Sequence, residues 1–188
     1  RLALDAYVAN TRKGSFNVTI NDIVLSTRGL SLSGYGNAKD ILSADPTISV
    51  EGNLSASIDS LMAFLPDSLN IIAEGGVQAS ISGSTRVSQL NIYNFSKSSL
   101  TGELSSERIV FKAPDDTIEA NINGLAIKLG PESRVSRRDS TRSFKLMGIT
   151  GNIGSLEASY GQSLALKGEN VTVSAKNSAN GIDTSKVN

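Results

Sequence analysis

Apolar and polar residues alternate along most of this chain. From Ile48 to Ile58 the even positions are apolar or glycine, and the odd positions are Ser, Glu or Asn. Successive side chains of a β-strand point to opposite faces, so this pattern predicts a strand with one apolar and one polar face. We expect 48–58 to be such a strand.

The same pattern recurs nearly from end to end. It appears at Phe16/Val18/Ile20, Val77/Ala79/Ile81, Ile109/Phe111/Ala113, Ile118/Ala120/Ile122, Leu125/Ile127/Leu129, Leu156/Ala158/Tyr160 and Val171/Val173/Ala175. Turn residues separate these runs at Gly29, 34–36, 75–76, 82–84, 113–117, 123–124 and 151–152. Strands of five to eight residues joined in this way predict an all-β antiparallel meander.

One segment, 60–66, departs from the alternation. Leu61, Phe64 and Leu65 stand at the i, i+3 and i+4 positions of a helix, and Pro66 follows them. We therefore expect one short helical turn over 61–65, with Ser60 as its N-cap.

Two polar segments lack a clear pattern. We expect 131–143 to be a loop or a long hairpin tip, and 176–188 to be a frayed tail. The predicted organisation is a single β-rich domain over 1–175, a fragment of a longer repetitive β protein, followed by that tail.

Composition excludes most catalytic chemistry. The 188 residues contain no His, Cys or Trp, which rules out His-based nucleophile activation, thiolate or imidazole zinc sites and disulfides. Lys and Arg together number 18, as do Asp and Glu, so the overall charge does not favour nucleic acid. No apolar run approaches the length of a membrane-spanning helix. We expect no enzyme activity, no metal and no cofactor.

Few residues resemble a conventional site. Arg134, Arg137, Arg138 and Arg142 are candidates for contact with anionic lipid headgroups, although such a run is more often a solvated loop. Asp115 and Asp116 are explained by the turn after Pro114. Glu103 and Glu107 lie among polar strand positions, and no other residues converge on them to form an acid–base site.

The amphipathic strands together create an apolar sheet face that must be covered. A two-sheet sandwich, a closed barrel, or a sheet folded over an apolar groove would each satisfy this requirement. The apolar positions are mostly Ile, Val, Leu, Ala and Gly, and aromatic residues form only 5% of the chain. Side chains of this size suit a groove left open for a flexible apolar ligand, and they also suit a small, well-packed sandwich.

Segment 48–66, a strand followed by a short Leu-rich turn ending in Pro66, resembles the AsmA/TamB family. Segment 71–83 resembles the Gly-rich strand that follows in that family, and 100–104 with 109–111 resembles the next recurring segment. The resemblance covers about 45–130 and carries no catalytic or metal motif.

The resemblance implies a periplasmic, taco-like folded sheet with an apolar interior, in a protein anchored in the inner membrane of a diderm bacterium. It implies phospholipid or another lipid as the partner, and association with membranes through regions outside this chain. It also implies a role in outer-membrane assembly, with outer-membrane assembly proteins as possible partners. The candidate groove lining is Leu54, Ala56, Ile58, Val77, Ala79, Ile81, Ile109, Phe111, Ile118, Ile122, Ile127, Leu129, Leu156 and Ala158.

Two other functions remain open on the sequence. A structural sandwich or solenoid module of a bacterial surface protein would use the same alternation without a ligand. A carbohydrate-binding sandwich is a third possibility, which the shortage of exposed aromatic residues disfavours.

Overall fold

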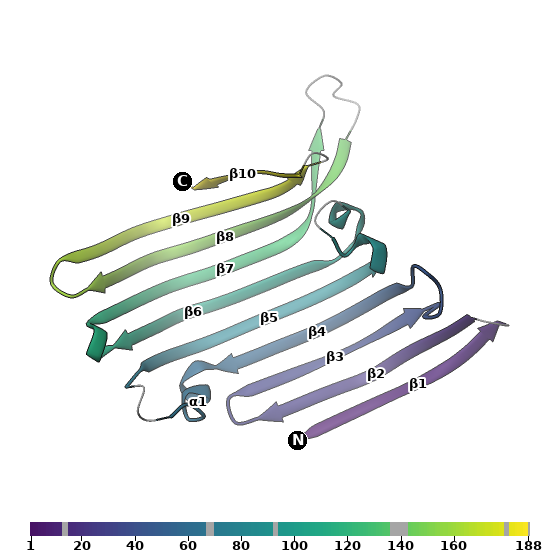
Figure 1. The fold of residues 1–188 in the computed structure, drawn as a ribbon, viewed down its shortest axis with the longest axis horizontal. Coiled ribbons are helices and arrows are strands. Elements are labelled where there is room, and N and C mark those ends of the chain that lie inside the picture. The colour runs from purple at the N-terminus through teal and green to yellow at the C-terminus, as the bar shows by residue number, and fades with distance from the viewer. Residues whose placement is uncertain (13–14, 67–69, 92–93, 136–142, 179–180, 188) are drawn as a thin grey trace.

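The computed structural model describes the backbone of all residues except 13–14, 67–69, 92–93, 136–142, 179–180 and 188. Side chains at 11–12, 96, 132–135, 143–146, 176–178 and 181–187 are also not described. The described chain forms one ten-stranded antiparallel sheet in which the strands follow one another in sequence order (Figure 1). The predicted all-β meander is confirmed.

The strands are long. They are β1 (Leu2–Arg12), β2 (Ser15–Thr27), β3 (Leu30–Lys39), β4 (Thr47–Ser57), β5 (Ile72–Arg86), β6 (Thr101–Ala113), β7 (Ile118–Val135), β8 (Ser143–Tyr160), β9 (Leu164–Ser178) and β10 (Gly181–Val187). One short helix, α1 (Ile58–Met62), follows β4, and three 3₁₀ turns lie at η2 (Val87–Gln89), η3 (Phe95–Lys97) and η4 (Pro114–Asp116). The turn predicted at 113–117 is confirmed, because η4 joins β6 to β7.

The helical turn exists but begins earlier than predicted. Ser57 is its N-cap, and the Ser57 hydroxyl accepts a hydrogen bond from the Ser60 N–H at 3.3 Å. The prediction that Ser60 caps the helix was wrong, because Ser57 already satisfies one of the free N–H groups of the first turn. Ile58 consequently belongs to the helix and not to the preceding strand.

The sheet is a single layer. The described residues contain no second sheet, and only four of their hydrophobic residues are buried: Leu100, Val110, Ala113 and Met147. β1 and β10 are the two outermost strands, so the ends of the chain lie at opposite edges of the sheet (Figure 1). Most of the apolar surface therefore lies on an uncovered sheet face.

Several glycine motifs that were predicted as turns lie inside strands. Residues 34–36 belong to β3, 75–76 and 82–84 to β5, and 151–152 to β8. The prediction of strands of five to eight residues was wrong for this reason. Glycine marks bends and close backbone contacts within strands as well as turns between them.

The clearest irregularity at such glycines crosses four neighbouring strands, from β6 to β9. The ladder of each pair of strands skips one position here: Glu107 and Gly124 between β6 and β7, Gly124 and Gly154 between β7 and β8, and Gly154 and Asn170 between β8 and β9. Gly124 and Asn170 have positive φ angles of 65° and 52°. We call this line of residues the crease.

The alternation changes phase at the crease. In β7 the apolar positions are even before it, at Ile118 and Ile122, and odd after it, at Leu125 and Ile127. The paired strand β8 changes phase at the same level, because Ile122 faces Leu156 while Leu125 faces Ile153. Both halves of each strand thus direct their apolar side chains to one face.

In β2, a bulge keeps the apolar side chains on one face of the sheet. Its pairing with β1 and with β3 shifts by one residue between Ile20 and Ile23, which leaves both isoleucines on the same face. A classic bulge places two residues of one strand opposite one of its neighbour and so corrects the phase.

The polar segments also form strands. β7 and β8 remain paired as far as Val135 and Ser143, so the described part of the segment 131–143 follows the hairpin alternative and not the loop, while 136–142 lie outside the described residues. β9 continues through the expected domain boundary to Ser178, and β10 pairs with it. Strand pairing uses backbone groups, so it does not require apolar side chains at these positions.

Gly124→Ala tests the crease. A residue with a Cβ pays about 1–2 kcal/mol in the left-handed region, so we expect a loss of that size in the free energy of unfolding. Gly130→Ala in the same strand is the matched control, because a Cβ there lies 3.5 Å from Thr101 Cγ2 without a positive φ. Urea denaturation should show the control neutral or slightly stabilising. Equal losses for both variants would contradict the account of the crease.

Candidate functional site

The register places nearly all candidate lining residues on one face of the sheet, which we call the apolar face. Directly paired residues share a face. Leu54 faces Ala79, Ala79 faces Leu104, and Leu104 faces Ile127. Beyond the crease, Phe111 faces Ala120, which faces Ala158. Ile58 is the one candidate outside these strands, because it lies in α1.

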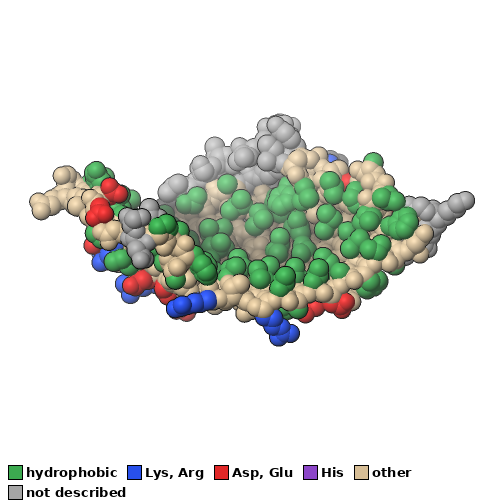
Figure 2. All heavy atoms as spheres, turned by 60° about the horizontal axis from the view of Figure 1, so that its bottom comes forward, with side chains coloured by type: hydrophobic (Ala, Val, Ile, Leu, Met, Phe, Trp, Pro, Cys, Tyr) green, Lys and Arg blue, Asp and Glu red, His purple; other side chains and the backbone are tan. Residues whose placement is uncertain are grey.

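The apolar face is larger than the candidate list. Sequence reasoning missed Leu2, Leu4, Val8, Ile23, Leu25, Leu30, Leu32, Ile149, Ile153, Leu164 and Leu166, which the pairing places on the same face. The alternation itself marks most of these positions, but the bulge in β2 and the crease obscure its phase. Figure 2 shows hydrophobic side chains gathered over a hollowed face of the molecule.

The apolar face is open to solvent in the described structure. Every candidate lining residue is half-buried except Ile81, which is 41% exposed. Side chains in a packed protein core are mostly fully buried. Exposed apolar patches of this extent are rare on monomeric soluble proteins and mark sites of interaction.

A row of glycines interrupts the apolar side chains between β3 and β6. Gly34 pairs with Gly52, which pairs with Ile81, which pairs with Gly102. A Cβ on Gly34 would lie 2.7 Å from the Glu51 carbonyl oxygen, so the backbone approaches too closely for a side chain there. Ile81 lies between Gly52 and Gly102. Because neither neighbour has a side chain that could cover it, Ile81 is exposed.

The opposite face is polar and is held by cross-strand pairs. Lys128 contacts Glu103 at 3.0 Å, and Lys167 contacts Glu157 at 3.3 Å. Each pair joins residues directly opposite one another in the ladder. Such exposed pairs contribute little to stability, but they keep this face soluble and reinforce the register.

The perturbed pKa values follow from these exposed polar contacts. The hydrogen bond that the Tyr35 hydroxyl donates to Glu51 raises the pKa of Tyr35. Hydrogen bonds to Glu157 and then Glu169 raise the pKa of Lys167. The N–H of Ser88 donates to Asp45 at 2.8 Å and lowers the pKa of that carboxyl group. Ordinary surface pairing accounts for all three.

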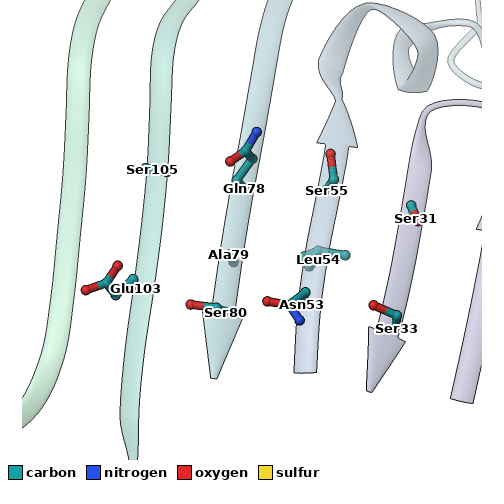
Figure 3. A pocket seen from close by; sticks show the side chains of 10 residues that line it. All are labelled: Ser31, Ser33, Asn53, Leu54, Ser55, Gln78, Ala79, Ser80, Glu103 and Ser105. Atoms are coloured by element: carbon teal, nitrogen blue, oxygen red, sulfur yellow. The ribbon is translucent and has the colours of Figure 1, made fainter. Parts of the chain in front are cut away.

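A shallow depression of about 360 Å³ lies on the polar face across β3, β4, β5 and β6 (Figure 3). It is lined by Ser31, Ser33, Asn53, Leu54, Ser55, Gln78, Ala79, Ser80, Glu103 and Ser105. Glu103 is its only carboxylate and already contacts Lys128. The depression therefore offers hydroxyl and amide groups, but it does not combine a nucleophile with a free general base.

The remaining candidates form no site in the described residues. No group of three acidic residues there could hold a metal ion. Asp115 lies in η4 and accepts a hydrogen bond from Asn70 at 2.8 Å. Arg137, Arg138 and Arg142 lie outside the described residues, and Arg134 is placed only by its backbone at the end of β7.

Fold and face define a single-layer antiparallel β-sheet protein with one apolar and one polar surface. No family model, curated protein or solved structure matches the chain. Among the described residues, no helix has the length and apolar character needed to cross a membrane.

Leu54→Asp and Ser55→Asp form a matched pair that tests the two faces. Both introduce one carboxylate into β4, but only the first places it between Leu32 and Ala79. We expect Leu54→Asp to lower the free energy of unfolding by about 1–2 kcal/mol and Ser55→Asp to stay within about 0.5 kcal/mol of the original protein. Chemical denaturation measures both, and similar losses would mean that the faces are assigned wrongly.

Proposed function

We propose that this chain is a non-enzymatic, periplasmic β-groove domain that shields phospholipid acyl chains as they pass between membranes. The observation that carries the proposal is the apolar face, which spans β1 to β9 and has no protein layer over it in the described residues. The resemblance of 48–66 to the AsmA/TamB family supports the cellular setting: an inner-membrane-anchored protein that supports outer-membrane assembly.

The energetics favour an acyl chain as the occupant. Each methylene removed from water contributes about 0.8 kcal/mol, so a chain of about sixteen carbons gains on the order of 12 kcal/mol before ordering costs. Neighbouring strands lie about 4.8 Å apart, so the face extends ~38 Å across nine strands. One leaflet of a bilayer core is ~15 Å deep, so the face has room for whole acyl chains.

The composition of the face suits movement of a lipid along it. The lining consists mainly of medium and small aliphatic side chains, with glycines among them in β3, β4 and β6. Contacts of this kind are non-directional and similar from row to row, so they create no single deep binding site. Headgroups would stay in water at the rim of the hollow.

A closed structural sandwich fits less well. Such a module would bury its inner face against a second sheet, with most inner side chains fully buried. Only four hydrophobic residues of the described chain are buried, and the meander continues in one layer from β1 to β10. Carbohydrate binding has less support, because the depression on the polar face contains no aromatic ring on which a sugar could stack.

Photocrosslinking in living cells tests the proposal. A photoreactive residue replaces Ile81 or Ile122 on the apolar face, and Gln78 or Asn121 on the opposite face provides the matched control. We expect lipid adducts at the first two positions and near-background signal at the controls, because acyl chains contact only the apolar face. The absence of adducts, or equal adducts on both faces, would reject the proposal.

A further inference from the structure

One end of the apolar face is closed, in contrast to the rest of it. Met147 of β8 is 3% exposed, and Leu100, which directly precedes β6, is 6% exposed. Met147 alternates with Ile149 along β8, and Leu100 alternates with Gly102 along β6, so both side chains point to the apolar face. Ile149 itself is 49% exposed. The boundary between the closed and the open part of the face is therefore sharp.

The connection between β5 and β6 closes this end of the face. Its second 3₁₀ turn, η3, lies beside β8, although β7 separates β6 from β8 in the sheet. η3 therefore crosses β7 on one side of the sheet, and the burial of Leu100 and Met147 identifies that side as the apolar face. The connection lies at the same end of the strands as the β7–β8 hairpin (Figure 1).

The polar groups buried with these side chains are already paired. Thr85 and Ser98 are 5% and 4% exposed. The Thr85 hydroxyl donates to the Arg86 carbonyl oxygen at 3.2 Å, and the Ser98 hydroxyl oxygen accepts a hydrogen bond from the Leu100 N–H at 3.3 Å. We call Thr85, Ser98, Leu100 and Met147, with η3 beside them, the closed end. It contains no charged side chain and suits apolar groups only.

Hydrogen bonds hold both ends of this connection. At its start the N–H and the hydroxyl of Ser88 donate to the Asp45 carboxylate at 2.8 and 2.9 Å, which joins η2 to the β3–β4 connection. At its finish the Ser99 N–H donates to the Ser84 carbonyl oxygen at 2.9 Å and continues the ladder of β5 and β6. The closed end is thus a built part of the fold.

At the opposite end of the strands the apolar face meets water. Tyr160, the last residue of β8, pairs with Ile118 on the apolar face and is 58% exposed. Strands β7 and β9 flank β8 on both sides, so this exposure belongs to the end of a strand and not to an edge of the sheet. Tyrosine combines an apolar ring with a polar hydroxyl and suits a boundary between acyl chains and water. We call this the open end.

We propose that a bound lipid lies along the strands, with the methyl ends of its acyl chains at the closed end and its headgroup toward Tyr160. This orientation rests on the proposed function. A phosphate headgroup at the closed end would lose water without gaining a hydrogen-bond partner, whereas a methyl group there loses nothing. β8 runs ~36 Å from Ile149 to Tyr160, and the acyl chains of one leaflet are ~15 Å deep, so the whole lipid has room.

Tryptophan fluorescence tests the orientation in a chain that has no tryptophan. Ile149→Trp places one reporter beside the closed end, and Tyr160→Trp places one at the open end of the same strand, both at exposed positions. Each variant is loaded with phosphatidylcholine that carries a nitroxide, a short-range quencher. The nitroxide is attached either to the headgroup or near the methyl end of an acyl chain.

We expect the chain-end label to quench Ile149→Trp about fivefold or more as strongly as the headgroup label, the ratio that burial of one unpaired polar group produces. Tyr160→Trp should show the reverse order. Equal quenching by the two labels would overturn the orientation. Stronger headgroup quenching at Ile149→Trp would also overturn it, and would favour a headgroup near Arg134 at the same end of the strands. If neither label quenched either reporter, the proposed function would fail, and the orientation with it.

Two substitutions at Met147 test whether the closed end sets the orientation. Met147→Gln adds an amide to the closed end at nearly unchanged side-chain length, and Met147→Leu is the apolar control. Combined with Ile149→Trp, we expect the first to reduce the difference between the two labels and the second to retain it. An unchanged difference in a Met147→Gln protein with intact circular dichroism would overturn the role of the closed end. If that variant does not fold, Ile149→Trp and Tyr160→Trp alone still decide the orientation.

Discussion

Every strand of this sheet has to direct its apolar side chains to the same side, and the rest of the structure depends on that constraint. Side chains alternate strictly along a strand, so one extra residue reverses all that follow. Strands of up to 18 residues accumulate such errors unless the phase is corrected. The crease at Gly124 and Asn170, and the bulge in β2, provide the correction.

The single layer makes the two faces chemically independent. On the polar face, cross-strand pairs such as Lys112 with Glu119 at 3.4 Å meet water and fix the register. On the apolar face, aliphatic side chains meet no protein partner across a core in the described residues. Hydrophobic burial is the main favourable term in folding, so an apolar occupant that bound only the folded state would stabilise it.

The alternation predicted the all-β meander and most of the apolar face, because period two is a local property that each strand shows by itself. Strand lengths were harder to predict, since Gly151 and the glycines of 34–36 are typical turn residues that here lie within strands. Their role depends on close approach to neighbouring strands, which the local sequence does not record. The same limit explains the helix: Ser57 and Ser60 are both good caps, and only the geometry after β4 distinguishes them.

Native mass spectrometry of the chain, purified from cells without detergent, tests most directly whether the apolar face carries lipid. The account predicts adducts with phospholipid masses, and it predicts their loss when Leu54→Asp places a carboxylate on the apolar face but not when Ser55→Asp places one on the polar face. A bare polypeptide mass, or adducts that survive both substitutions equally, would contradict it.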